Sequence, residues 1–111
     1  MQTYTPDNWK VVKISSKEHG DVYKVIVSWQ GGYAAADLWK ISSGFVDLKE
    51  FDDRYETHQA SGSFYVLYKN YEKESSLIRD KFRDFTEVLK QVSGSIEYIE
   101  MKDFKEIFLK K

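Results

Sequence analysis

Five carboxylates stand close together in the middle of the chain, just before one of its two histidines. They are Asp47, Glu50, Asp52, Asp53 and Glu56, and they are followed by His58. Carboxylate oxygens are ligands that Mg²⁺ and Ca²⁺ prefer, but this spacing matches no EF-hand loop. Because aspartate is also a favoured turn residue, the cluster is interpreted as a solvated hairpin turn. We therefore expect no metal site and no cofactor.

His58 also raises the question of catalysis. It could act as a general base, with Asp52 or Asp53 orienting its ring and Ser61 or Ser63 as the nucleophile. No nucleophile elbow or comparable motif surrounds these residues, and a catalytic assignment needs a shared geometry that spacing alone does not supply. The sequence predicts a protein that is not an enzyme and has no catalytic residues.

A third kind of chemistry is suggested by aromatic residues that alternate with cationic residues near predicted strand ends. The candidates are Tyr33, Trp39, Lys40, Arg54, Tyr68 and Lys69. Aromatic rings can stack on unpaired bases while lysine and arginine pair with phosphates. These six residues are the candidate site for RNA or single-stranded DNA. The alternative is that the aromatic rings are core residues beside solvated lysines. Gly31-Gly32, which could pass for a phosphate loop, is interpreted as a hairpin turn.

The composition of the chain limits which of these functions are plausible. The chain has 111 residues, 41% hydrophobic and 32% charged, which is typical of one globular domain, here 1–111. The formal net charge is −1, so a strong general attraction to a polyanion is not expected. There is no cysteine, and the N-terminus has no signal-peptide pattern. No apolar run reaches membrane-spanning length. We expect a cytoplasmic protein with no membrane partner.

The elements that would position these residues are mostly strands. Segments 9–16, 22–30, 38–50, 55–60 and 63–71 are predicted strands, with 55–60 at a sheet edge. In 22–30, Tyr23, Val25, Val27 and Trp29 share one face.

Segment 38–50 changes register within itself. Trp39 and Ile41 have odd numbers, whereas the later apolar residues Val46 and Leu48 have even numbers. A change of this kind moves the buried set to the other face unless a bulge absorbs it, and a glycine suits such a bend. Gly44 lies at this point. The pattern predicts a sharply bent strand, as small barrels require.

Segment 63–71 is apolar on both faces. Phe64, Val66 and Tyr68 share one face, and Tyr65, Leu67 and Tyr71 are assigned to the other. A small barrel has one interior, so the second face must meet a helix or another subunit. Tyr65, Leu67 and Tyr71 are the predicted interface of a homo-oligomer.

One long helix is predicted over 75–92. Ile78, Phe82, Phe85, Leu89 and Val92 form its apolar stripe, Ser75 or Ser76 begins it and Gly94 ends it. A C-terminal strand over 95–101 and a tail to 111 follow, with 103–109 either helix or strand. The expected fold is mainly β, a small, strongly bent, five-stranded SH3-like or Sm-like barrel over 9–71, with the helix after the fifth strand. An α+β sandwich is the alternative.

Several motifs resemble a family of small proteins from cyanophage genomes and marine metagenomes. They are TPDNWKVVKI at 5–14, WQGGY at 29–33, LWKISSGF at 38–45 and SGSFY at 61–65. That family resembles the Sm-like (LSm) fold, whose members form rings through strand edges and, in the wider class, bind RNA. The resemblance implies a ring-forming protein in an infected host cell. The chain has no Arg-Gly pair, and Asn70 is the only asparagine after Asn8, so no RNA-binding residue is transferred from that class.

Two functions follow as hypotheses. The first is a non-enzymatic, ring-forming protein that binds RNA or single-stranded DNA. The alternative is a protein–protein interaction module that modulates a host or phage complex, which would present an exposed apolar surface and no affinity for nucleic acid.

Overall fold

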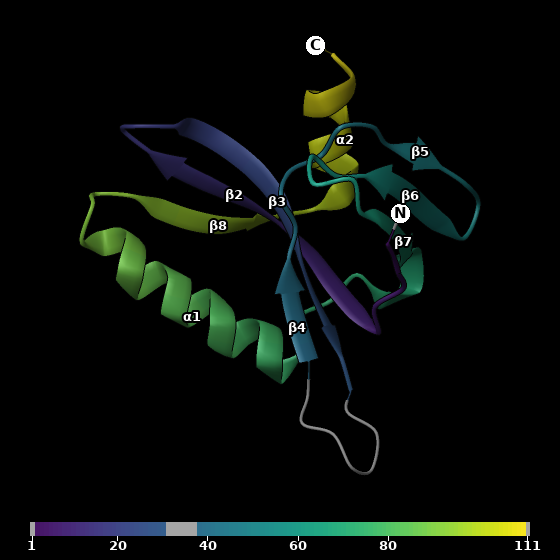
Figure 1. The fold of residues 1–111 in the computed structure, drawn as a ribbon, viewed down its shortest axis with the longest axis horizontal. Helices are drawn as coiled ribbons and strands as arrows, with labels where there is room; N and C mark the ends of the chain where they lie inside the picture. Colours follow the sequence, from purple (N-terminus) through teal and green to yellow (C-terminus); the bar gives the residue numbers. More distant parts are fainter. Residues whose placement is uncertain (1, 31–37, 111) are drawn as a thin grey trace.

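The computed structural model describes residues 2–30 and 38–110, which form two four-stranded sheets and two α-helices (Figure 1). In sheet B the strand order is β4 (Leu38–Ile41), β3 (Gly20–Trp29), β2 (Asn8–Ser16) and β8 (Ser95–Ile99). In sheet A the order is β1 (Thr3–Tyr4), β7 (Phe64–Tyr68), β6 (Arg54–His58) and β5 (Lys49–Glu50). The fold is therefore mainly β, as the sequence predicted.

Sheet B is antiparallel and is built around the β2–β3 hairpin. Its register runs from Asn8 opposite Ser28 to Ser16 opposite Gly20, where the chain turns. Gly20 has a φ of +66°, a left-handed conformation that favours glycine. The predicted alternation along β3 is confirmed. Val25 and Val27 belong to one buried cluster, whereas Ile26 belongs to another on the opposite face.

The larger core lies between the two sheets. Its buried members include Trp9, Val11, Val25 and Val27 from sheet B, and Tyr55, Tyr65 and Leu67 from sheet A. Helix α2 (Met101–Leu109) completes it with the buried side chains of Met101 and Phe104. This helix resolves the uncertain segment 103–109. It also means that the chain has two helices instead of the expected one.

The smaller core lies under helix α1 (Ser76–Lys90), which covers the other face of sheet B (Figure 1). Four of the five predicted stripe residues pack there: Ile78, Phe82, Phe85 and Leu89. The fifth, Val92, follows the helix and is 63% exposed. Ser75 caps the start of α1, because its Oγ accepts a hydrogen bond from Ile78 N at 3.1 Å.

The strand predicted over 38–50 is interrupted where its register changes. β4 ends at Ile41, Gly44 has a φ of +136°, and the chain then enters sheet A, where it forms β5. The two sheets are further joined by isolated bridges from Phe45 to Gln59 and from Trp9 to Glu72. In the described ranges 2–30 and 38–110, the strands form two sheets and no closed barrel.

Two expectations about sheet A are wrong. β6 is not an edge strand, because β7 and β5 pair with its two sides. β7 is also internal, with β1 parallel on one side and β6 antiparallel on the other. Its inward residues Tyr65 and Leu67 are 1% and 0% exposed. They cannot form the predicted oligomer interface, because the opposing sheet and α2 already cover that face. After β7 the chain makes the short 3₁₀ helix η1 (Lys69–Tyr71).

Among the residues that the structure describes, no helix combines the length and the apolar character needed to cross a membrane.

Candidate functional site

Three of the six candidate nucleic-acid residues come together on sheet A. Arg54 of β6 lies opposite Tyr68 of β7, and Lys69 follows directly. The charge of Arg54 is already engaged, however. Its Nε donates to Glu56 Oε2 at 2.8 Å and its Nη1 donates to Asp53 Oδ1 at 2.9 Å. A phosphate at this position would have to compete with two carboxylates.

Lys69 is engaged in the same way. Its Nζ donates to Glu50 Oε2 at 2.6 Å, and Lys105 of α2 donates to Glu50 Oε1 at the same distance. The hydrogen bond from Lys105 and then that from Lys69 hold the pKa of Glu50 below its usual value. The bond between Glu50 and Lys105 also ties β5 to α2. Lys69 therefore has a structural partner, and it is not a spare cation at an anion site.

The other candidate residues lie elsewhere. Trp39 and Lys40 are on β4 of sheet B, on opposite faces of that strand because consecutive side chains alternate. Trp39 is 36% exposed; its ring makes an edge contact with Phe85 and has the ammonium of Lys81 at 5.1 Å from its centroid. Tyr33, like the Gly31-Gly32 turn, lies outside the described residues. The structure thus separates the predicted site into two parts.

The acidic cluster is dispersed among cationic partners. Glu50, Asp53 and Glu56 bind lysine or arginine, as described above. Asp47 binds His58: its Oδ2 lies 2.8 Å from His58 Nδ1, and its Oδ1 accepts from His58 N at 2.7 Å. Among the described residues, no group of three or more histidine or acidic side chains is arranged to hold a metal ion.

The His58–Asp47 pair differs from the arrangement that the sequence suggested. Partial burial raises the pKa of Asp47, but the two hydrogen bonds from His58 and the nearby positive charges outweigh it, so the net pKa is lowered. Asp47 takes the orienting position that was considered for Asp52 or Asp53. Ser61 and Ser63 bond to each other at 3.3 Å. The pair orders the chain beside β6, and in the described residues no hydrogen bond joins His58 to Ser61 or Ser63.

The first surface open to a ligand is the outer face of sheet A. We call it the outer surface; it consists of Arg54, Glu56 and His58 from β6 and of Phe64, Val66 and Tyr68 from β7. The inward residues Tyr55, Thr57, Tyr65 and Leu67 alternate with them, so all six point away from the core. Each of the six is half-buried. The helices pack mainly elsewhere, α1 on β3 and β8 and α2 on β2.

Aromatic contacts run across this outer surface. The rings of His58 and Phe64 have centroids 4.8 Å apart, and Tyr68 makes an edge contact with Tyr71 at 6.2 Å. Tyr71 is the one residue of the predicted oligomer interface that is exposed, at 40%. Phe51, also exposed, lies under the guanidinium of Arg54 at 4.4 Å. The outer surface is therefore aromatic, and its charges are paired.

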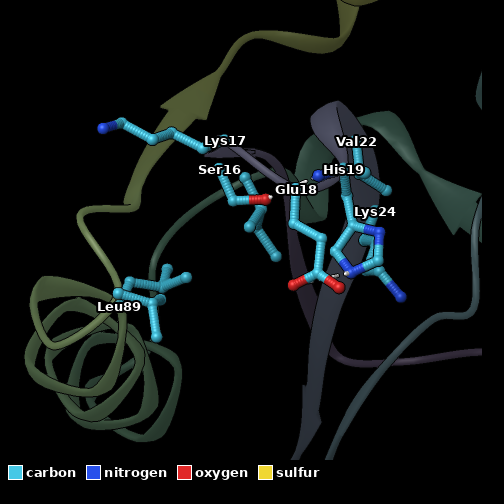
Figure 2. Close-up of a pocket in the computed structure, with 9 residues that line it drawn as sticks. Ser16, Lys17, Glu18, His19, Val22, Lys24 and Leu89 are labelled. Atoms are coloured by element: carbon cyan, nitrogen blue, oxygen red, sulfur yellow. Dashed lines mark hydrogen bonds and ion pairs between the residues drawn. The ribbon is translucent and has the colours of Figure 1, made fainter.

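The second open surface is a groove between the tip of the β2–β3 hairpin and the end of α1, with a volume of about 670 Å³ (Figure 2). We call it the hairpin groove. Its aliphatic residues are Ile14, Val22, Leu89 and Val92. Its charged residues include Lys17, Glu18 and Lys24. The sequence analysis did not identify it, although the extension of the apolar stripe to Val92 beyond the end of the helix was a signal.

Comparisons of this chain with protein-family models, with curated protein sequences and with solved structures found no match.

Proposed function

We propose that this protein is a non-enzymatic binding module that docks another protein on the outer surface of sheet A. The observation that carries the proposal is a sheet face with half-exposed aromatic and aliphatic side chains, those of Phe64, Val66 and Tyr68. Both helices make their main contacts elsewhere, with strands of sheet B. Aromatic residues are enriched at protein interfaces, where they supply large contact areas.

The charges favour a protein partner over a nucleic acid. Arg54 is bound by Asp53 and Glu56, and His58 by Asp47. Nucleic-acid binding depends on unpaired cations that neutralise phosphates. Among the six residues that define the outer surface, Arg54 and His58 are the basic ones, and both are already paired with carboxylates. A docked protein can cover the aromatic rings while these ion pairs stay at the rim, where they cost little.

The partner docks against the face of sheet A and does not extend its edges. The edge strands β1 and β5 have two residues each, which is too short to pair with a substantial added strand. Strand addition to sheet A, as one form of the ring that the Sm-like resemblance implies, would need longer free edges than these; the edge strands of sheet B, β4 and β8, have four and five residues. A second copy of this chain remains within the proposal as a partner that docks face to face.

The two sheets also support kinship with the Sm-like barrel as part of this proposal. The chain passes from β4 to sheet A through the bend at Gly44, and the isolated bridges Phe45–Gln59 and Trp9–Glu72 add two further links between segments that are distant in the sequence. These links are what an opened five-stranded barrel would retain. The function proposed here does not depend on this kinship.

The test uses one substitution at two matched sites. Val66→Lys places a cation in the centre of the outer surface, opposite Glu56, whereas Val88→Lys places it on the exposed side of α1. Native mass by light scattering and quantitative mass spectrometry of cross-linked, nuclease-treated cell extract are measured for all three proteins. We expect self-association, or one defined partner, in the wild type and in Val88→Lys, and its loss in Val66→Lys.

A partner retained equally by all three proteins would overturn the proposal, as would a monomeric wild type that captures no defined protein. Circular dichroism of Val66→Lys provides the folding control. Should that variant be unfolded, Tyr71→Lys replaces it at the border of the same surface, where 40% exposure makes the change tolerable.

A second candidate function, binding of single-stranded nucleic acid, is favoured by the exposed edge of β4. Trp39 offers a partly exposed ring with Lys81 beside it, and Lys40 is the next residue. Fluorescence anisotropy of labelled RNA and DNA, at low and near-physiological salt, tests this directly. Binding that weakens with salt and is further weakened by Lys81→Gln would support it. No binding at low salt would eliminate it.

A further inference from the structure

The hairpin groove arises because α1 does not cover the whole outer face of sheet B. Leu89 lies in the last turn of the helix, and Val92 follows it. Ile14 and Val22 stand opposite each other on β2 and β3, close to the turn of the hairpin. Figure 2 shows Leu89 on α1 and the hairpin residues Val22 and Lys24 on the two sides of the groove. The groove therefore combines the aliphatic residues that the helix leaves uncovered.

Backbone groups at Ile14, Val22 and Leu89 already have partners within the protein. Ile14 and Val22 are opposed within the β2–β3 ladder, and β8 pairs with the other side of β2 at Ile14. The Leu89 carbonyl accepts hydrogen bonds from Val92 N at 3.0 Å and from Gly94 N at 2.8 Å. An extended peptide would bury its own polar backbone here without compensation, whereas an alkyl chain needs no hydrogen bonds.

The polar residues of the groove lie at the hairpin and are mainly cationic. Lys17 and Lys24 provide two positive charges, and Glu18 opposes them with one negative charge. The Glu18 carboxylate lies 4.0 Å from His19 Nε2. Lys24 Nζ makes one weak hydrogen bond, at 3.3 Å, to the Ser43 carbonyl. Figure 2 shows the Lys17 and Lys24 side chains extending to opposite sides of the groove, and each ammonium group keeps donors to spare, so an anionic group would meet one of them.

We propose that the hairpin groove binds a single-chain anionic amphiphile, with its alkyl chain on Ile14, Val22, Leu89 and Val92 and its carboxylate at Lys17 or Lys24. The volume lies within the range of natural ligand sites, and the division into an aliphatic part and a cationic end matches the two halves of a fatty acid. This site is separate from the outer surface of sheet A. Either proposal can fail without the other.

The test titrates the full-length protein with fatty acids below their micellar concentrations and follows methyl groups by NMR. Octanoate and decanoate differ by two methylene groups. If both methylenes are buried, decanoate binds roughly fifteen-fold more tightly, since each buried methylene strengthens binding by about four-fold. We expect saturable shifts at Ile14, Val22, Leu89 and Val92. Decyltrimethylammonium, with a slightly longer alkyl chain and the opposite charge, should bind at least several-fold more weakly.

Two pairs of variants locate the site. Val92→Ser should weaken decanoate binding by about five-fold through lost apolar burial, whereas Val88→Ser should not. Both valines are 63% exposed, and only Val92 lines the groove, so their effects on stability should be similar. Lys17→Gln combined with Lys24→Gln should weaken binding several-fold, as expected for exposed ion pairs.

The control for this variant combines Lys102→Gln with Lys110→Gln, two lysines that do not line the groove. It removes the same amount of charge and should leave the affinity for decanoate unchanged. Several results would overturn the proposal. These are no saturable binding of decanoate, equal binding of the cationic amphiphile, equal effects of Val88→Ser and Val92→Ser, or shifts confined to the outer surface around Val66.

Discussion

Removing the hydroxyl of Tyr65 should make this protein more stable. The Tyr65 side chain is 1% exposed, and its hydroxyl is the one fully buried side-chain polar atom in the described residues without a hydrogen-bond partner. Its ring packs in the core against Tyr4, with centroids 5.2 Å apart. An unpaired buried hydroxyl costs roughly 1–3 kcal/mol of desolvation. Tyr65→Phe keeps the ring and its contacts and removes this cost.

The expected gain is about 1 kcal/mol, because the small void left by the oxygen offsets part of the benefit. For a domain of this size it corresponds to roughly 4 °C in Tm. Urea unfolding measures it as a higher midpoint at an unchanged slope, since the surface exposed on unfolding is the same. Tyr98→Phe is the control. Its hydroxyl donates to Glu74 Oε2 at 2.6 Å, so its removal should destabilise by about 1 kcal/mol.

The alkaline limb of the stability curve gives an independent measurement. Burial, with a smaller effect from Tyr4, raises the pKa of Tyr65 to about 12. The unfolded chain ionises this tyrosine near its model value of 10.0, so the contribution is fully present below that pH and is lost as pH rises towards 12. The loss amounts to roughly 2–3 kcal/mol, which Tyr65→Phe should abolish. Equal or lower stability of Tyr65→Phe at neutral pH, with an unchanged alkaline limb, would refute the reasoning.

Three further predictions concern single residues. Burial raises the pKa of Glu72 despite the hydrogen bond from Met101 N, so this carboxyl contributes stability below its unfolded value of 4.5 that is lost as pH rises. Glu72→Gln, which keeps a carbonyl acceptor, should flatten this dependence in unfolding measured from pH 4 to 7, and an unchanged slope would contradict it. The pKa of Asp47 is lowered by His58, so its contribution is present above 3.8 and lost at more acidic pH. Asp47→Asn should be less stable than wild type at pH 6 and equal to it at pH 2; a constant difference would count against this pairing. Ser93 has a φ of 55°, so Ser93→Gly should stabilise by roughly 0.5–1 kcal/mol in thermal unfolding, and a loss of stability would show that its side chain matters more than its backbone strain.

Elements that follow from local periodicity could be predicted from the sequence. The stripe from Ile78 to Leu89 placed α1, and the change of register before Val46 located the break at Gly44. The sequence assigned the end of α1 to Gly94, one residue after the residue that takes the left-handed conformation. Ser93, not Gly94, takes the left-handed conformation, and Gly94 is small because a Cβ there would lie 3.0 Å from the Ser15 carbonyl. That contact depends on tertiary packing, which the sequence does not reveal.

The separation of the predicted nucleic-acid site into two parts has a related reason. Arg54 and Lys69 have the residue types that bind phosphate, but their partners fix what they do. Glu50 is 19 residues from Lys69 and 55 from Lys105, separations that no local pattern can detect. Tyr65 and Leu67 were assigned to an external partner for the same reason. Nothing in 63–71 indicates that α2, which begins 30 residues later, closes over the core they occupy.

The lengths of the elements explain why the hairpin groove lies where it does. α1 has 15 residues and spans roughly 22 Å at the helical rise, whereas the 10 residues of β3 span roughly 33 Å. The start of α1 is held at the end of β3 that lies away from the hairpin turn, because Ser75 Oγ and Ser28 Oγ share a hydrogen bond of 2.8 Å. The helix must therefore end before it reaches that turn. The exposed strip at the tip of the hairpin is the direct result, and a longer α1 would fill it.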